Sequence, residues 1–116
     1  METKALETST VMGFGSRGVT MTEAARADSP AGFRIHLATF DADSLLGRHS
    51  AGVWQLFTVT SGSGWVEGED GELYTVRFGD AVVWQPGEQH SMGSDGGMSA
   101  LIVQSPQPLY APGNPA

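Results

Sequence analysis

Three histidines and one glutamine are the side chains whose types and spacing could support chemistry in this sequence. His49 lies shortly before Gln55, and His90 follows a Pro-Gly turn later in the chain. Residues two apart on a strand share a face, so His49 and Ala51 point the same way. An unbroken strand would put Gln55 on that face too, whereas a turn at Gly52 would put it on a neighbouring strand opposite His49. Either geometry lets the imidazole and the carboxamide meet.

Short strands separated by turns must position these residues. Alternating and β-branched residues predict strands over residues 33–40, 55–60, 81–84 and 99–103, and one through His90 and Met92. A hairpin is predicted between residues 65–67 and 74–76, and turns at residues 41–44, 61–64, 85–88 and 93–97. Because no long stretch has helical periodicity, this spacing predicts a single all-β domain of the sandwich or barrel type.

The chain divides into three parts. Residues 1–32 form a polar N-terminal arm, with edge strands expected at 11–14 and 19–21 and one helical turn at 22–26 capped by Thr22. Residues 33–104 form the β body. Residues 105–116 carry four of the six prolines and are expected to be an extended tail.

Composition excludes several function classes. The 116 residues include 13 acidic and 6 basic side chains, for a formal net charge of -7. Such a chain is repelled by nucleic-acid phosphates and by anionic membrane surfaces, and its apolar runs are too short to cross a bilayer. The N-terminus lacks a secretion signal, so we expect a soluble cytoplasmic protein. With no cysteine, thiolate catalysis and Cys-ligated metal sites are excluded.

Two segments carry a family resemblance. Residues 47–55 (GRHSAGVWQ), followed by six residues and Gly62, resemble the first cupin motif, which reads His-x-His, three or four residues, Glu, six residues, Gly. Residues 79–90 (GDAVVWQPGEQH) resemble the second, which reads Gly, five residues, Pro-x-Gly, two residues, His. The resemblance covers residues 33–104 and implies a cupin-type double-stranded β-helix, that is, a jelly-roll β-barrel, usually dimeric and with a metal in its mouth.

Carried over by position, the resemblance implies that His49, Gln55 and His90 are the metal ligands. Two ligand positions depart from the motif, because Ala51 stands for the second histidine and Gln55 for the glutamate. The proline of the second motif is also shifted. A His-Gln-His set leaves the charge of a divalent metal uncompensated, binds it more weakly and keeps positions open to water or substrate. The lost side chain leaves room for an anionic co-ligand, such as a substrate carboxylate or a halide. The candidate ions are Zn, Ni, Fe, Mn and Cu.

The same residues have plainer interpretations. His49 and His90 could line the barrel and hydrogen-bond to neighbours and water, with Gln55 as a buried amide that satisfies both. His36 is interpreted as an ordinary strand residue that matters only if its face is the inner one. Several apolar side chains could line a ligand pocket or simply pack the core and a dimer interface; those assigned to the ligand are Ala51, Phe57, Trp84 and Met92.

Three functions remain open. The first is a metal-dependent cupin that binds a small organic ligand and transforms it, as a dioxygenase or an isomerase. The second is a metal-free small-molecule binding module without catalysis. The third is a metal-free isomerase or epimerase in which His49 or His90 acts as general base. No catalytic residue is assigned. A homodimer is expected, with Phe14, Trp54 or Leu56 at its interface.

Overall fold

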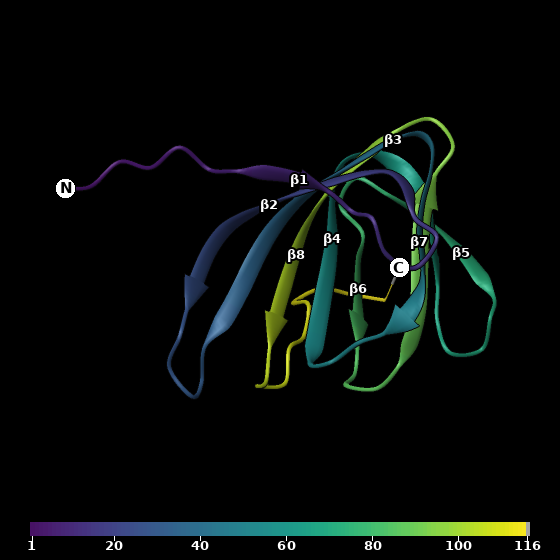
Figure 1. Ribbon diagram of the computed structural model, residues 1–116. Coiled ribbons are helices and arrows are strands. Elements are labelled where there is room, and N and C mark those ends of the chain that lie inside the picture. The colour runs from purple at the N-terminus through teal and green to yellow at the C-terminus, as the bar shows by residue number, and fades with distance from the viewer. Residues whose placement is uncertain (116) are drawn as a thin grey trace.

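The computed structural model describes residues 1–115, which contain eight β-strands joined by turns and loops (Figure 1). Ala116, the last residue of the expected tail, lies outside this range. The strands are β1 (Thr8–Thr10), β2 (Arg17–Ala27), β3 (Phe33–Ser50), β4 (Trp54–Glu67), β5 (Leu73–Arg77), β6 (Ala81–Trp84), β7 (Gln89–Ser94) and β8 (Met98–Ser105). No helix among these residues could span a membrane. The all-β prediction is confirmed.

Two long strands, β3 and β4, are shared by two facing sheets. The first half of β3 pairs with β8 from Arg34 to Phe40, and its second half pairs with β7 from Ser44 to Ser50. The first half of β4 pairs with β6 and β8, and its second half pairs with β5 and β7. One sheet therefore runs β1-β2-β3-β8-β4-β6 and the other β3-β7-β4-β5, which is a jelly roll (Figure 1).

The turns predicted at residues 41–44 and 61–64 are wrong, because these residues lie inside β3 and β4. They are corners at which each strand passes from one sheet to the other. Asp43 bends β3 with a φ of 57°, and Gly62 bends β4 with a φ of 73°. A Cβ at Gly62 would lie 2.3 Å from the carbonyl oxygen of Gly97, so only glycine fits this corner.

The N-terminal arm differs from its prediction in two places. The helical turn expected at residues 22–26 is wrong, since this segment belongs to β2 and pairs with β3, Thr22 opposite Leu37 and Arg26 opposite Arg34. The first edge strand is β1 rather than residues 11–14, while residues 19–21 do lie in β2 as predicted. Residues 1–7 extend away from the sheets in Figure 1. The hairpin of β4 with β5 is confirmed.

Alternation of side chains fills the space between the sheets. In β4, Gln55, Phe57 and Val59 are buried while the residues between them face outward. Phe57 and Val59 belong to an apolar cluster with Phe40 and Met92; burying each such side chain stabilises the fold by about 1.5–3 kcal/mol. Where β4 begins and β8 ends, the inward positions are polar, as at Gln55 and Gln104. The candidate site lies at this end of the sheets.

Candidate functional site

A cavity of about 330 Å³ lies between the sheets at their polar end. This volume is in the range of small-molecule sites. Its walls come from β2, β3, β4, β8 and the loop before β2, and its lining residues are Val11, Phe14, Met21, Arg34, His36, Leu46, His49, Gln55, Ile102 and Gln104. Within the described residues, Arg34 is the only Arg or Lys in this lining, and no Asp or Glu belongs to it.

One row of cross-strand neighbours forms the polar wall of the cavity. Arg34 of β3 is paired with Gln104 of β8, Gln104 with Gln55 of β4, and Gln55 with Trp84 of β6. Side chains directly opposite each other on paired strands are close enough to interact. The Gln104 Nε2 donates a hydrogen bond to Gln55 Oε1 at 3.2 Å. This bond orients the buried Gln55 carboxamide.

The two imidazoles of the second sheet lie side by side. His49 of β3 is the register partner of His90 of β7, and their ring centroids are 4.3 Å apart. His49 Nδ1 lies 2.7 Å from the Gly47 carbonyl oxygen, and His90 Nδ1 lies 3.2 Å from that of Glu88. Because a carbonyl oxygen can only accept, each Nδ1 carries a proton, and Nε2 is the ring nitrogen through which either imidazole can act as an acceptor.

The Nε2 atom of His90 has no partner. Among residues 1–115 it is the one buried side-chain nitrogen or oxygen without a hydrogen bond. Burial lowers the pKa of His90 to about 4; the Glu88 carbonyl opposes this shift, and the charges of His49 and Arg48 add to it. The ring is therefore neutral at pH 7. Its bare lone pair can serve a metal ion or a donor group of a ligand.

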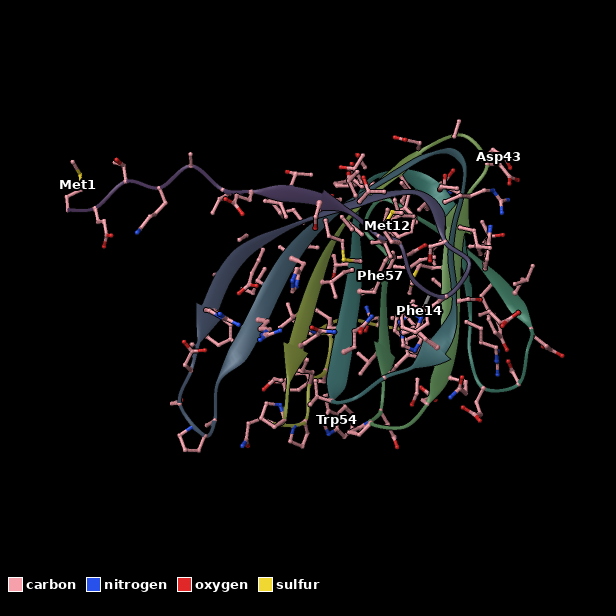
Figure 2. The ribbon with its side chains drawn as sticks, in the orientation of Figure 1. Met1, Met12, Phe14, Asp43, Trp54 and Phe57 are labelled. Carbon is pink, nitrogen blue, oxygen red and sulfur yellow. The ribbon has the colours of Figure 1, made fainter. Side chains whose placement is uncertain are left out.

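Aromatic rings continue this pair in both directions. Phe14 stacks on His49 with centroids 4.6 Å apart, and Trp84 stacks on His90 at 4.4 Å. Trp84 also contacts Phe57 edge-on, and Phe57 belongs to the apolar core. Figure 2 shows Phe57 between the two sheets and Asp43 at the outer bend of β3. Phe14 lines the cavity but remains 63% exposed. Trp84 is buried and shields His90 from water, whereas Phe14 covers one face of the half-buried His49.

The loop that carries Phe14 is held against β3 at Gly47. The Gly47 N–H donates to Ser16 Oγ at 3.0 Å, and a Cβ at Gly47 would lie 1.7 Å from the Phe14 carbonyl oxygen. Phe14 itself has a φ of 61°, a conformation that a bulky residue keeps only when its surroundings impose it. Gly47 thus contacts the loop through its N–H and His49 through its carbonyl oxygen.

The predicted site residues are distributed unequally around the cavity. His49 and Gln55 line it, and His90 lies behind His49. Four others are absent from the cavity lining that the structure describes: Ala51, Phe57, Trp84 and Met92. Ala51 is buried at the turn between β3 and β4, where its N–H donates to the Glu88 carbonyl. Contact of these four residues with a ligand stays a prediction.

Two polar residues of the cavity wall, Arg34 and Gln104, were missed in the sequence, and His36, which was expected to matter only on an inner face, also lies in the wall. His36 faces inward and lies with its Nε2 3.9 Å from Glu23 Oε2. Gln104 shares the inner face of β8 with Ala100 and Ile102, but the strand predicted from the sequence stopped one residue before it. Arg34 shares the inner face of β3 with His36. Alternation was the available signal for all three, since residues two apart point the same way.

Metal donors in the site are few. Among the described residues, no group of three or more His, Cys, Asp or Glu side chains could hold a metal ion. The available donors are the Nε2 atoms of His49 and His90 and the carboxamide of Gln55. The arrangement can present two neutral acceptors and one amide to a small ligand or to a cation.

Comparison with known proteins identifies the family. The Cupin domain family matches residues 36–104, and no curated protein matches the sequence. Three of the solved structures that are similar in fold serve as examples. The polyketide cyclase RemF from Streptomyces resistomycificus is 18% identical over 92% of this chain and 81% of its own, with a TM-score of 0.73. KdgF from Halomonas sp. is 21% identical over 88% and 89%, with a TM-score of 0.72. A predicted oxalate decarboxylase from Thermotoga maritima is 20% identical over 86% of this chain and 90% of its own, with a TM-score of 0.71.

The match to the family covers more than half of the chain, and the jelly roll agrees with it. This protein therefore belongs to the cupin domain family.

Proposed function

We propose that this cupin binds a small organic ligand in the cavity between its sheets, at a divalent metal held by His49 and His90. The observation that carries the proposal is the His49–His90 pair. The two rings lie 4.3 Å apart, both Nδ1 atoms donate to backbone carbonyls, and the His90 Nε2 is buried without a partner. Metal-binding histidines typically donate their other N–H in this way.

The side chains fit a weakly held ion with open coordination positions. Neutral imidazole suits Zn, Cu, Ni and Fe, and the low pKa of His90 keeps its ring neutral. Gln55 is the third candidate donor, because its carbonyl oxygen accepts from Gln104 and keeps a second lone pair. A metal at these donors would supply Lewis-acid polarisation of a ligand oxygen, or oxygen activation if it is iron. Trp84 packs on His90 and excludes water from it, Phe14 stacks on His49, and Gln104 orients Gln55.

Metal content per chain tests the proposal. Protein purified without a histidine tag is expected to carry near-stoichiometric metal by elemental analysis. His49→Ala and His90→Ala should abolish it, because each removes one of two imidazole donors. His36→Ala is the matched control and should keep its metal, since His36 lines the same cavity but lies outside the ring pair. Metal retained by both variants, or none taken up from Zn, Ni, Mn or anaerobic Fe(II), would contradict the proposal.

Metal-free ligand binding is the second candidate function. Two observations favour it: the Gln55 oxygen already accepts a hydrogen bond from Gln104, and the described cavity lining contains no carboxylate. The imidazole Nε2 atoms would then accept hydrogen bonds from the ligand. Ligand affinity that survives treatment with a chelator supports this function over the first.

We propose in addition that two copies of the chain associate through the outer face of the larger sheet. Ile35, Val103, Leu56 and Val83 form one row across four strands. The next row contains Leu37 and Leu101, and none of the six side chains is fully buried. Contiguous exposed apolar side chains mark interaction surfaces. A second copy fits because this face is uncharged, whereas a chain of net charge -7 repels its own kind elsewhere.

Leu56→Asp is expected to convert the dimer into a monomer. In the dimer the substitution would bury two carboxylates in the shared face, one from each copy, without a partner. Light scattering at micromolar concentration measures the change. Thr75→Asp is the control, since it adds the same charge on β5, away from this sheet face. A monomeric wild-type protein, or dimeric Leu56→Asp, would disprove the interface.

A further inference from the structure

We infer that the ligand of the cavity carries a carboxylate and that Arg34 and Gln104 bind this group at the cavity mouth. The inference rests on the proposed function only in that the cavity holds a small organic ligand. It applies with or without a metal. It names a chemical class for the ligand and two binding residues, neither of which belongs to the cupin motifs.

The charge of the cavity wall is opposite to that of the chain. The chain has more than twice as many acidic as basic residues, yet the described lining of the cavity contains Arg34 and no carboxylate. The two imidazoles add no negative charge. A small anion entering from solvent therefore meets the charge of Arg34 at the mouth. The carboxylates beside the mouth, Glu23 and Asp28, are both paired with Arg26.

Arg34 also lacks an internal partner. Within residues 1–115, Arg17, Arg26 and Arg48 each pair with a carboxylate, whereas no ion pair or side-chain hydrogen bond involves the Arg34 guanidinium. Arg77 is the other arginine without an ion pair, and it lies on β5 in the opposite sheet. A guanidinium offers five donors in a planar fork that matches a carboxylate. Arg34 is therefore free to bind one.

Gln104 supplies a second donor beside Arg34. The two residues are register partners on β3 and β8. The Gln104 Nε2 uses one of its two N–H groups on Gln55, which leaves the other available. Both residues also line an adjacent hollow of about 370 Å³, so the mouth has space for an acid group. Asp28 lines the same hollow, and its carboxylate is paired with Arg26 at 3.5 Å.

The depth of the site sets the layout of the ligand. Arg34 is exposed, Gln104 and His49 are half-buried, and Gln55 and His90 are buried. The acid end of the ligand therefore lies at the mouth beside Arg34 and Gln104. A hydrogen-bond donor, or an oxygen that binds a metal, faces the imidazoles further in. A cavity of about 330 Å³ limits the ligand to a small organic acid.

Matched pairs of acids and amides test the inference. The probes are benzoate with benzamide, nicotinate with nicotinamide, and lactate with lactamide, and calorimetric titration measures their affinities. We expect at least one acid to bind about tenfold more tightly than its amide, because hydrogen bonds between charged groups exceed neutral ones by that margin. Arg34→Gln should remove this preference, because it weakens binding of the acid about tenfold more than binding of the amide. Arg77→Gln, with the same loss of charge, should keep the preference.

Each outcome decides the inference. If no acid binds more tightly than its amide, if Arg34→Gln weakens both members of a pair equally, or if inorganic phosphate binds more tightly than every acid, the inference is wrong. A cavity that takes acids and amides equally, and loses both in Gln55→Ala, keeps the proposed ligand binding and rejects only the acid group. Metal content in the histidine variants is measured separately, so failure of one result does not imply failure of the other.

Discussion

Acidification is expected to remove about 3 kcal/mol of folding stability from the chelator-treated protein through His90 alone. Burial lowers the pKa of the folded His90 to about 4, against 6.5 for an ordinary histidine. Above pH 6.5 the ring is neutral in both states and contributes nothing. Between pH 6.5 and 4 the unfolded chain binds a proton that the folded chain does not. Stability therefore falls as the pH drops through this window and levels off below it.

Urea unfolding at a series of pH values measures this loss. Carboxylates titrate over part of the same range, so the informative quantity is the difference between wild type and His90→Phe. Phenylalanine keeps a ring between His49 and Trp84 but cannot be protonated. We expect the stability of the variant to decline less steeply than that of wild type by about 3 kcal/mol in total. Identical slopes would show that His90 is not buried as a neutral ring.

This result bears on the function of the ring pair. A buried imidazole with an unpartnered nitrogen lowers stability, and a phenyl ring in its place would not. Proteins retain such groups where a site needs them. The pH measurement thus tests, without any ligand, the feature that the proposed function depends on.

Gly47→Ala is expected to release the N-terminal loop from the site. The new Cβ would overlap the Phe14 carbonyl oxygen, which would lie 1.7 Å away. Because the clash is with backbone, no side-chain rotation relieves it, and the loop must move. Phe14 then leaves its stack on His49, and the Ser16 hydrogen bond to Gly47 is lost.

Limited trypsin digestion followed by mass spectrometry detects this movement. Arg17 directly follows the loop, and its Nε–H donates to the Asp43 carbonyl at 3.1 Å. Cleavage after Arg17 should become at least about tenfold faster in Gly47→Ala, which corresponds to local opening easier by about 1.4 kcal/mol. Gly52→Ala is the control, since a Cβ there meets nothing within 4 Å. Equal cleavage rates in the two variants would mean that Gly47 does not hold the loop.

Local pattern was sufficient to predict much of the framework. Alternating, apolar and β-branched residues placed the first half of β3, residues 55–60 of β4, all of β6 and residues 99–103 of β8, and turn residues placed the β4–β5 hairpin. The strand predicted through His90 and Met92 after the Pro-Gly turn is β7. These features depend on residues close together in the chain, where backbone preferences act directly.

Pairing between distant segments decided the rest. Residues 41–44 and 61–64 have turn composition, yet they continue β3 and β4 because different strands hold the two halves of each. Residues 22–26 are extended only because β3 lies beside them. Composition and spacing predicted an all-β domain, which the structure confirms, and they identified His49, Gln55 and His90 as the candidate residues for chemistry. Tertiary structure alone brought Arg34, Gln104, His36 and Phe14 to the same cavity, because cross-strand register joins residues far apart in sequence, and no local preference encodes it.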